Sequence, residues 1–167
     1  MTERIARFCA LCATPLEMRE RFGRLRPVCP NCDHTVFFEP KVAVVAFVAQ
    51  GDQLLLVKRL RDPGKGKWAL PAGFVEADEG PRAAAERETL EETGMVVQVT
   101  RLLDLLHRPD VDGAADIVIA YEARCNGGLL CAADDAEDAA WFTRDHLPEI
   151  ALTTTRLLVA CWLDNKL

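Results

Sequence analysis

The chain has 167 residues, of which 50% are hydrophobic and 28% are charged, which suits one ordinary folded domain with a small appendage and excludes a broadly disordered chain. The net charge of −6 argues against indiscriminate nucleic-acid binding, so nucleic acid is not an expected partner. No stretch approaches the roughly 20 apolar residues of a membrane span, and the N-terminus MTERIARFC does not resemble a secretory signal, so we expect a cytoplasmic protein without membrane contact.

A small metal-binding module is the first expected element. Four of the seven cysteines form two C-x2-C pairs, Cys9 with Cys12 and Cys29 with Cys32, separated by sixteen residues. This spacing is typical of a site where two tight turns bring four thiolates around one tetrahedral zinc ion, and redox-active thiols are the alternative. The polar stretch between the pairs suits a short hairpin but cannot hold a core alone, so zinc must supply the stability. We assign this zinc ribbon to residues 1–38.

The main domain, residues 39–167, is expected to combine strands and helices. Apolar, β-branched runs at Lys41–Ala49 and Gln53–Val57 flank a turn signal and predict a hairpin in the centre of a sheet that is buried on both faces. A Gly/Pro/Lys-rich loop at Asp62–Pro71 precedes a helix at Pro81–Thr93, which starts with proline and is followed by the C-terminal cap Gly94. The remaining expected elements are strands at Val96–Leu106, Ile117–Arg124 and Ala139–Phe142, loops at Pro109–Asp116 and Asn126–Asp135, and a helix at Thr153–Leu163. This order indicates an α/β sandwich with a mixed sheet.

Three glutamates recur at helical spacing within the first predicted helix. Glu88, Glu91 and Glu92 are spaced i, i+3 and i+4 and therefore project from one side, with Leu90 and Ala83 expected opposite them, facing the core. Like charges so arranged repel each other by a few tenths of a kcal/mol per pair, which indicates a bound cation. Mg²⁺ prefers such oxygens and completes its coordination with water and substrate phosphates. The alternative is a solvated acidic helix face.

The residues around these glutamates resemble the signature of the Nudix hydrolases, G-x5-E-x7-R-E-U-x-E-E-x-G-U, where U is aliphatic. The segment from Gly73 to Met95 matches all seven fixed positions and departs only at Thr89, an aliphatic position in the signature. Chance would produce such a match on the order of once in 10⁸ starting points. KWALPAG at 67–73 and AWF at 140–142, followed by Leu147-Pro148, extend the resemblance to about 41–163. It implies a Nudix-type α/β/α sandwich.

The resemblance also implies a reaction. Nudix hydrolases cleave a nucleoside diphosphate linked to another moiety by attack of water on phosphorus, with Mg²⁺ or Mn²⁺ as cofactor. The preceding cysteine pairs are similar to the zinc-ribbon branch, which includes ADP-ribose, FAD and NADH pyrophosphatases. We expect ADP-ribose as the first substrate, FAD as the second and NADH as the third. NADH is placed last because the S-Q-P-W-P-F-P motif of the long NADH enzymes is missing. Family analogy further implies a homodimer.

Two other functions stay open. The first is a regulatory or nucleic-acid-binding zinc-ribbon protein with an inactive Nudix-like domain, helped by the arginines at positions 19, 21, 24 and 26. The intact carboxylates argue against it, since a relic is expected to have lost at least one. The second is the same chemistry on another substrate, namely the clearance of oxidised nucleotides or the removal of caps from RNA.

The roles of individual residues follow from the resemblance. Glu91 and Glu92 are the implied principal metal ligands, Glu88 is a ligand or the base, and the carbonyl of Gly73 or Ala72 is a further donor. Arg87 is expected to orient Glu91, with an ordinary salt bridge within the helix as the alternative. Glu79 serves either the loop or the metal.

A later loop and a basic strip supply the other candidates. Nudix enzymes often take a further acid from a later loop, and Glu137 is favoured here among four acids at 134–138, with a solvated run of charges as the alternative. For substrate binding we name Arg59, Lys67 and Trp68, because basic groups attract a diphosphate and an aromatic ring can stack on a base. Surface exposure and core packing are the respective alternatives.

Overall fold

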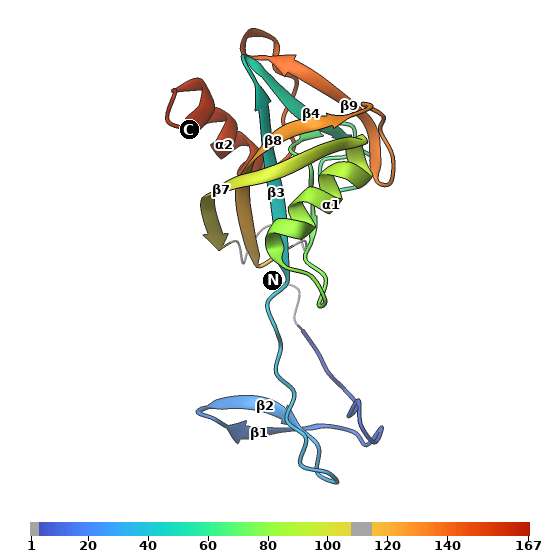
Figure 1. Ribbon diagram of the computed structural model, residues 1–167. Coiled ribbons are helices and arrows are strands. Elements are labelled where there is room, and N and C mark those ends of the chain that lie inside the picture. The colour runs from blue at the N-terminus through green and yellow to red at the C-terminus, as the bar shows by residue number, and fades with distance from the viewer. Residues whose placement is uncertain (1–3, 108–114) are drawn as a thin grey trace. The chain divides into compact units, whose positions relative to one another are not determined.

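The computed structural model describes residues 4–107 and 115–167 of the chain (Figure 1). Contacts within the chain divide it into two compact units, Met1–Pro40 and Lys41–Leu167, and each unit is described by itself. None of the described helices is long and apolar enough to cross a membrane. Residues 108–114, which include most of the loop expected at Pro109–Asp116, lie outside the described residues.

The first unit is built on a hairpin between two cysteine turns. Strands β1 (Glu17–Arg21) and β2 (Arg24–Val28) pair antiparallel around a turn at Phe22-Gly23. The two turns are equivalent, because Ala13 N donates to Cys9 O (2.8 Å) and Asp33 N donates to Cys29 O (3.0 Å). Few side chains of this unit are buried, so it has almost no apolar core of its own.

The second unit is organised around a mixed sheet. Strand β3 (Val42–Gln50) lies at its centre, pairs in parallel with β8 (Ile117–Gly128), and forms the predicted hairpin with β4 (Gln53–Arg59). The other pairs are antiparallel: β7 (Met95–His107) with β8, and β9 (Ala136–Thr143) with β4. A short 3-10 turn, Arg144–His146, follows β9.

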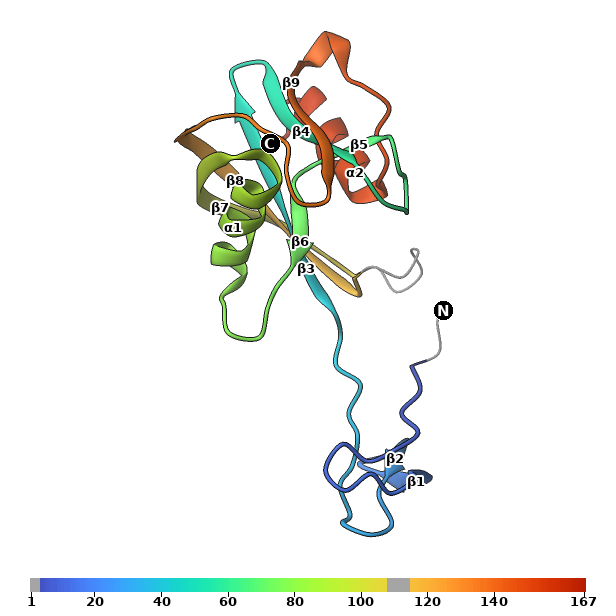
Figure 2. The ribbon, with the colours of Figure 1, turned by 90° about the vertical axis from the view of Figure 1, so that its right-hand side faces the viewer.

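Two helices cover opposite faces of this sheet, as Figure 2 shows. Side chains of β3 alternate between two clusters: Val44, Ala46 and Val48 pack on the side of α1 (Pro81–Thr93), and Val45 and Phe47 pack on the side of α2 (Thr153–Leu163). Because both faces of the central strands are buried, their sequence is almost continuously apolar. The predicted α/β/α sandwich is confirmed.

Helix α1 has its predicted bounds but not its predicted core face. Pro81 opens it, and Gly94 adopts the left-handed conformation (φ 68°) and donates from its N–H to Leu90 O (2.8 Å). The expectation that Leu90 and Ala83 face the core is wrong, because both are exposed. The buried side chains are instead Ala84, Ala85, Thr89, Glu92 and Thr93.

The burial of threonines in place of Leu90 has a physical basis. The Thr89 hydroxyl donates to Ala85 O (2.7 Å) and the Thr93 hydroxyl donates to Thr89 O (2.5 Å). A buried hydroxyl that is hydrogen-bonded to the preceding turn carries little desolvation cost, so a polar residue can occupy the core. The departure from the signature at Thr89 is therefore compatible with a packed helix.

The region expected to be a loop at Asp62–Pro71 is also different from the prediction. Its end contains strand β5 (Trp68–Ala69), which pairs with β4, and β6 (Ala72–Phe74) follows directly and pairs with β3. These strands are too short to produce a recognisable alternation of polar and apolar residues. Their importance is positional, since β6 leads into the 75–80 segment before α1.

Candidate active site

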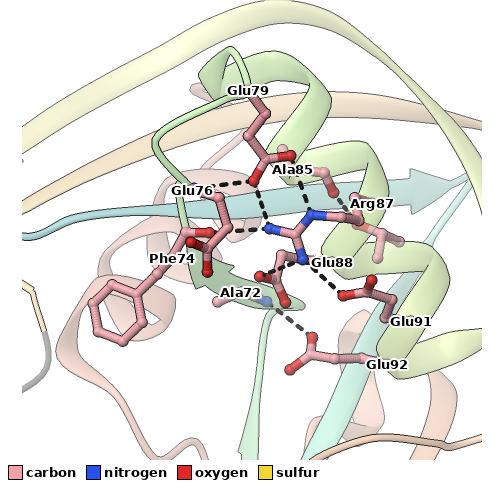
Figure 3. A network of polar contacts seen from close by, with 10 residues as sticks. Ala72, Phe74, Glu76, Glu79, Ala85, Arg87, Glu88, Glu91 and Glu92 are labelled. Carbon is pink, nitrogen blue, oxygen red and sulfur yellow. Dashed lines mark hydrogen bonds and ion pairs between the residues drawn. The ribbon is translucent and has the colours of Figure 1, made fainter.

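Arg87 lies at the centre of a polar network that joins helix α1 to the preceding segment (Figure 3). Its Nε and Nη2 donate to the Glu79 carboxylate (3.1 and 2.6 Å), and Nη2 also donates to Phe74 O (3.1 Å). Its Nη1 donates to Glu91 (2.7 Å) and lies 2.9 Å from Glu88 Oε1. Arg87 is therefore more than the partner of one residue along the helix, because it contacts three carboxylates and a backbone carbonyl.

Glu79 belongs to this network and is hydrogen-bonded to the backbone of the segment before α1. One of its oxygens accepts a hydrogen bond from Glu76 N (3.1 Å) in addition to those from Arg87. The hydrogen bonds from Arg87 and from Glu76 N hold the pKa of the Glu79 carboxyl below its usual range, and the same pairing raises the pKa of Arg87. In this arrangement Glu79 connects the backbone at Glu76 to Arg87 on helix α1.

Glu88 lies directly against the backbone of β6. A Cβ built on Gly73 would come within 1.9 Å of the Glu88 carboxyl carbon, so this approach requires glycine at position 73. The side chain is largely buried, and desolvation raises the pKa of the Glu88 carboxyl while Arg87 opposes that rise.

Glu92 is the most deeply buried of the three glutamates. It is 4% exposed, and its Oε2 accepts a hydrogen bond from Ala72 N (2.9 Å). Burial raises the pKa of the Glu92 carboxyl to about 9, and the neighbouring Asp135 adds to the rise. A cation near this buried carboxyl would stabilise its charged form. Acids with strongly raised pKa values are common at functional sites.

The three glutamates are divided between two positions. Glu88 and Glu92 both approach β6, whereas the Glu91 side chain is 46% exposed and turns toward Arg87. Among the described residues, the four cysteines are the only group of three or more candidate ligands whose ligand atoms all lie within 4.8 Å of one another.

A cavity of about 340 Å³ lies beside Glu88 and strand β6. Four acids line it, Glu76 and Glu88 from the α1 side and Asp134 and Asp135 from the loop before β9, and Arg59 is the basic side chain among its described lining residues. The Arg59 Nε donates to Pro63 O (2.7 Å), which holds its guanidinium in place. Other residues that line the cavity come from β3, β6, β8 and the start of α2: Ala43, Val45, Phe74, Val118, Leu152, Thr153 and Thr154.

Several residues named from the sequence lie elsewhere. Glu137 does not line the cavity and pairs instead with Lys58 (3.2 Å), so Asp134 and Asp135 are the acids that the later loop places there. Lys67 pairs with Glu149 (2.5 Å), and Trp68 packs edge-to-face on Phe142 with ring centroids 4.6 Å apart. Of the three substrate-binding candidates, only Arg59 lines the cavity in the described part of the chain.

Sequence reasoning missed the contribution of helix α2 to the cavity. Thr153 and Thr154 open this helix some 80 residues after Gly73, and both line the same cavity. No motif surrounds them in the sequence. Their position was not recognisable because it depends on the closure of the sheet by α2.

The four cysteines of the first unit form a compact cluster. Sulfur–sulfur distances are 3.5 Å for Cys12 and Cys29 and 3.6 Å for both Cys9 and Cys12 to Cys32. Tetrahedral zinc with Zn–S bonds of about 2.3 Å requires sulfur atoms about 3.8 Å apart, whereas a disulfide requires about 2.05 Å. The cluster therefore fits a four-thiolate metal site and not a disulfide.

Comparison with known proteins decides the family. The model of the NUDIX domain matches residues 39–163. The chain belongs to the NUDIX family. A crystal structure of a NUDIX hydrolase from Nitrosomonas europaea superposes with a TM-score of 0.88 at 26% identity, over 96% of this chain and 92% of that one.

Two relatives of this NUDIX hydrolase have named activities. The "ADP-ribose pyrophosphatase" of Methanocaldococcus jannaschii is 36% identical over 126 residues, 75% of each chain. The "NAD-capped RNA hydrolase NudC" of Chromobacterium violaceum is 33% identical over 150 residues, 87% of this chain, which spans about half (53%) of that protein. The family and these relatives confirm the predicted enzyme class, a pyrophosphohydrolase.

Proposed function

We propose that this NUDIX hydrolase cleaves the diphosphate bond of a nucleoside diphosphate linked to another moiety, with ADP-ribose as its first substrate. The observation that carries the proposal is the acid-lined cavity beside Gly73. Glu88 is largely buried there, the nearby Glu92 is buried, and Arg59 lines the same cavity. The name of the relative from Methanocaldococcus jannaschii supports ADP-ribose. FAD and NADH follow as further candidates.

The residues at this site suit a divalent cation. Glu91 and Glu92, with the carbonyl of Gly73 or Ala72, would hold Mg²⁺ or Mn²⁺, because such hard ions prefer carboxylate and carbonyl oxygens. A buried carboxyl such as Glu92, which has one backbone N–H as its hydrogen-bond donor, gains most from a nearby cation. When bound, the metal would neutralise the diphosphate and polarise its phosphorus.

The protein's own groups have separable tasks in this proposal. Glu88 is the base that accepts a proton from the attacking water, because it lines the cavity and burial raises its pKa above that of an exposed glutamate. Arg87 positions Glu88 and Glu91 by its hydrogen bonds. Arg59 attracts the diphosphate. The four cysteines, Cys9, Cys12, Cys29 and Cys32, hold a structural zinc ion.

The test is a metal-dependent activity screen with ADP-ribose, FAD, NADH and a cap analogue. We expect hydrolysis of ADP-ribose to AMP and ribose 5-phosphate only when Mg²⁺ or Mn²⁺ is present, with ¹⁸O from labelled water in one product. Glu91→Gln should lower kcat/KM at least about 100-fold. Glu137→Gln, which removes an acid outside the cavity, is the matched control. Full activity of Glu91→Gln would contradict the proposal.

A second substrate class is favoured by one observation. The match to the protein named NAD-capped RNA hydrolase covers 150 residues, more than the 127 residues of 41–167, so the likeness extends into the cysteine-containing unit. We therefore include NAD-capped RNA as a second candidate substrate, cleaved at the same diphosphate. Release of nicotinamide mononucleotide from a short capped RNA tests it, with the uncapped strand as control.

A further inference from the structure

Four arginines lie on one face of the β1–β2 hairpin. Register places Arg19 opposite Arg26 and Arg21 opposite Arg24, and directly opposed residues of an antiparallel pair share a face. Like charges facing each other across two strands destabilise a hairpin. This arrangement is unfavourable in a unit with almost no core, and an anionic ligand would relieve it.

Only half of this charge is compensated within the described chain. Arg19 is hydrogen-bonded to Glu17 (2.8 Å) and Arg21 to Asp33 (2.6 Å), whereas Arg24 and Arg26 have no acidic partner among the described residues. The Arg26 Nε is also buried without a hydrogen-bond acceptor in the described structure. Strand β2 therefore carries two arginines, Arg24 and Arg26, that have no acidic partner among the described residues.

Two exposed phenylalanines adjoin these cations. The Arg26 guanidinium lies over the Phe37 ring (4.5 Å to its centroid), and the Phe37 and Phe22 rings are 5.7 Å apart. Phe22 is 76% exposed and Phe37 is 53% exposed. Phe22 also occupies a left-handed turn position (φ 52°), where a bulky side chain is strained. Neither ring contributes to a buried core, so packing does not explain them.

We infer that this arginine–phenylalanine face, formed by Arg19, Arg21, Arg24, Arg26, Phe22 and Phe37, binds single-stranded RNA. Such a strand supplies both missing partners, since its phosphates pair with arginines and its unstacked bases stack on aromatic rings. A double helix offers phosphates but no free base faces. The negative charge of the whole chain does not oppose this, because residues 17–28 carry four arginines against two glutamates. The choice of RNA over DNA rests on the capped-RNA substrate proposed above. The inference that this face binds a single-stranded nucleic acid does not rest on that substrate.

The experiment measures fluorescence anisotropy of a 5′-labelled RNA strand of about 12 nucleotides with the full, zinc-loaded chain, over a range of salt concentrations. We expect Phe22→Ala with Phe37→Ala to weaken binding about 10-fold or more. Arg24→Ala with Arg26→Ala should weaken it and make the salt dependence shallower. Phe38→Ala and Arg124→Ala are matched controls, because they remove an exposed ring and an exposed arginine outside this face.

The outcomes separate this inference from the proposed function. Zinc content and ADP-ribose hydrolysis should stay unchanged in the variants of the face, and Glu91→Gln should bind RNA normally while losing hydrolysis. Absence of RNA binding, equal binding by the double-phenylalanine variant, or equal binding of a DNA strand would each overturn the inference. A change from dimer to monomer in that variant, without RNA binding by the parent chain, would identify a second copy of the chain as the occupant and likewise overturn it.

Discussion

Gly73 shows how one missing side chain can set the position of a carboxylate. The Glu88 carboxyl occupies the space that any Cβ at position 73 would fill. Because the obstructing atoms belong to the far end of a flexible side chain, a larger residue would displace the carboxylate and leave the backbone in place. The effect of a substitution should therefore appear in activity more than in stability.

We predict that Gly73→Ala lowers kcat/KM for ADP-ribose by about 10- to 100-fold, while the free energy of unfolding changes by less than about 1 kcal/mol. Activity assays and urea unfolding on the same preparations measure the two effects. Gly80→Ala is the control, because a Cβ there meets nothing within 4 Å. Loss of folding with Gly73→Ala would show that the contact is structural.

Glu92 gives the metal-free enzyme a pH-dependent stability. Its folded-state pKa is raised to about 9, above the ordinary value of 4.5, so between these values the folded state binds more protons than the unfolded state. The free energy of unfolding therefore falls as pH rises through this window, by at most about 1.4 kcal/mol per pH unit for one group. Mg²⁺ should oppose the fall, since a cation replaces the proton.

Urea unfolding between about pH 5.5 and pH 8.5 tests this prediction in zinc-loaded protein without Mg²⁺. Glu92→Gln should reduce the slope of stability against pH, because the amide does not titrate, and Glu137→Gln should leave the slope unchanged. Stabilisation by Mg²⁺ should grow with pH in the parent chain. A stability that rises with pH in the parent chain would contradict the assignment.

At the scale of elements, Arg87 fastens helix α1 to the segment that precedes it. The guanidinium holds Glu79 with two hydrogen bonds and Phe74 O with a third, so the helix and the 74–79 segment move together. A lysine keeps the charge but cannot reproduce the planar fork of donors. The proposed base Glu88 and the proposed ligand Glu91 contact the same guanidinium.

We predict that Arg87→Lys lowers kcat/KM about 10- to 100-fold, and that Glu79→Gln has a similar effect. The loss in the double variant should be smaller than the sum of the two single losses, because part of the effect of Arg87 depends on its contact with Glu79. Measurements of kcat/KM on the parent chain, the two single variants and the double variant give the coupling energy between Arg87 and Glu79. Arg82→Lys, on the same helix but beside Tyr121, is the control. Fully additive losses would indicate independent roles.

At the scale of the molecule, the two units depend on different forces. The Lys41–Leu167 unit has an extensive core on both faces of its sheet, whereas the described part of Met1–Pro40 buries little beyond Val28 and two of its cysteines. A unit of this size without a core requires a metal to offset its chain entropy. Its stability should therefore follow zinc.

We predict that a zinc chelator unfolds the first unit and leaves the second unit folded. Limited proteolysis with mass spectrometry should then show new cleavage sites within 4–40, protected again when zinc is restored, and no new sites in 41–107. Cys29→Ser should behave like the chelated protein, whereas Cys131→Ser, an exposed cysteine outside the cluster, should not. Protection of residues 4–40 without zinc would contradict the prediction.

The sequence by itself determined the features that neighbouring residues encode. Pro81 and Gly94 marked both ends of α1, apolar runs marked the buried strands, and the spacing of the cysteine pairs indicated their cluster. The segment from Gly73 to Met95 indicated the family that the comparison confirms. These signals are local, because helix caps, strand periodicity and motif spacing depend on residues close together in the chain.

Only the tertiary structure decided which side chains share the cavity. Arg59, Glu88, Asp134 and Thr154 come from four separate segments, and their meeting depends on how β4, α1, the loop before β9 and α2 close around β6. The same packing buried Thr89, left Leu90 in solvent, and turned Lys67 and Trp68 to partners elsewhere. Long-range contacts set the outcome at these positions, because each residue's own pattern is compatible with either environment.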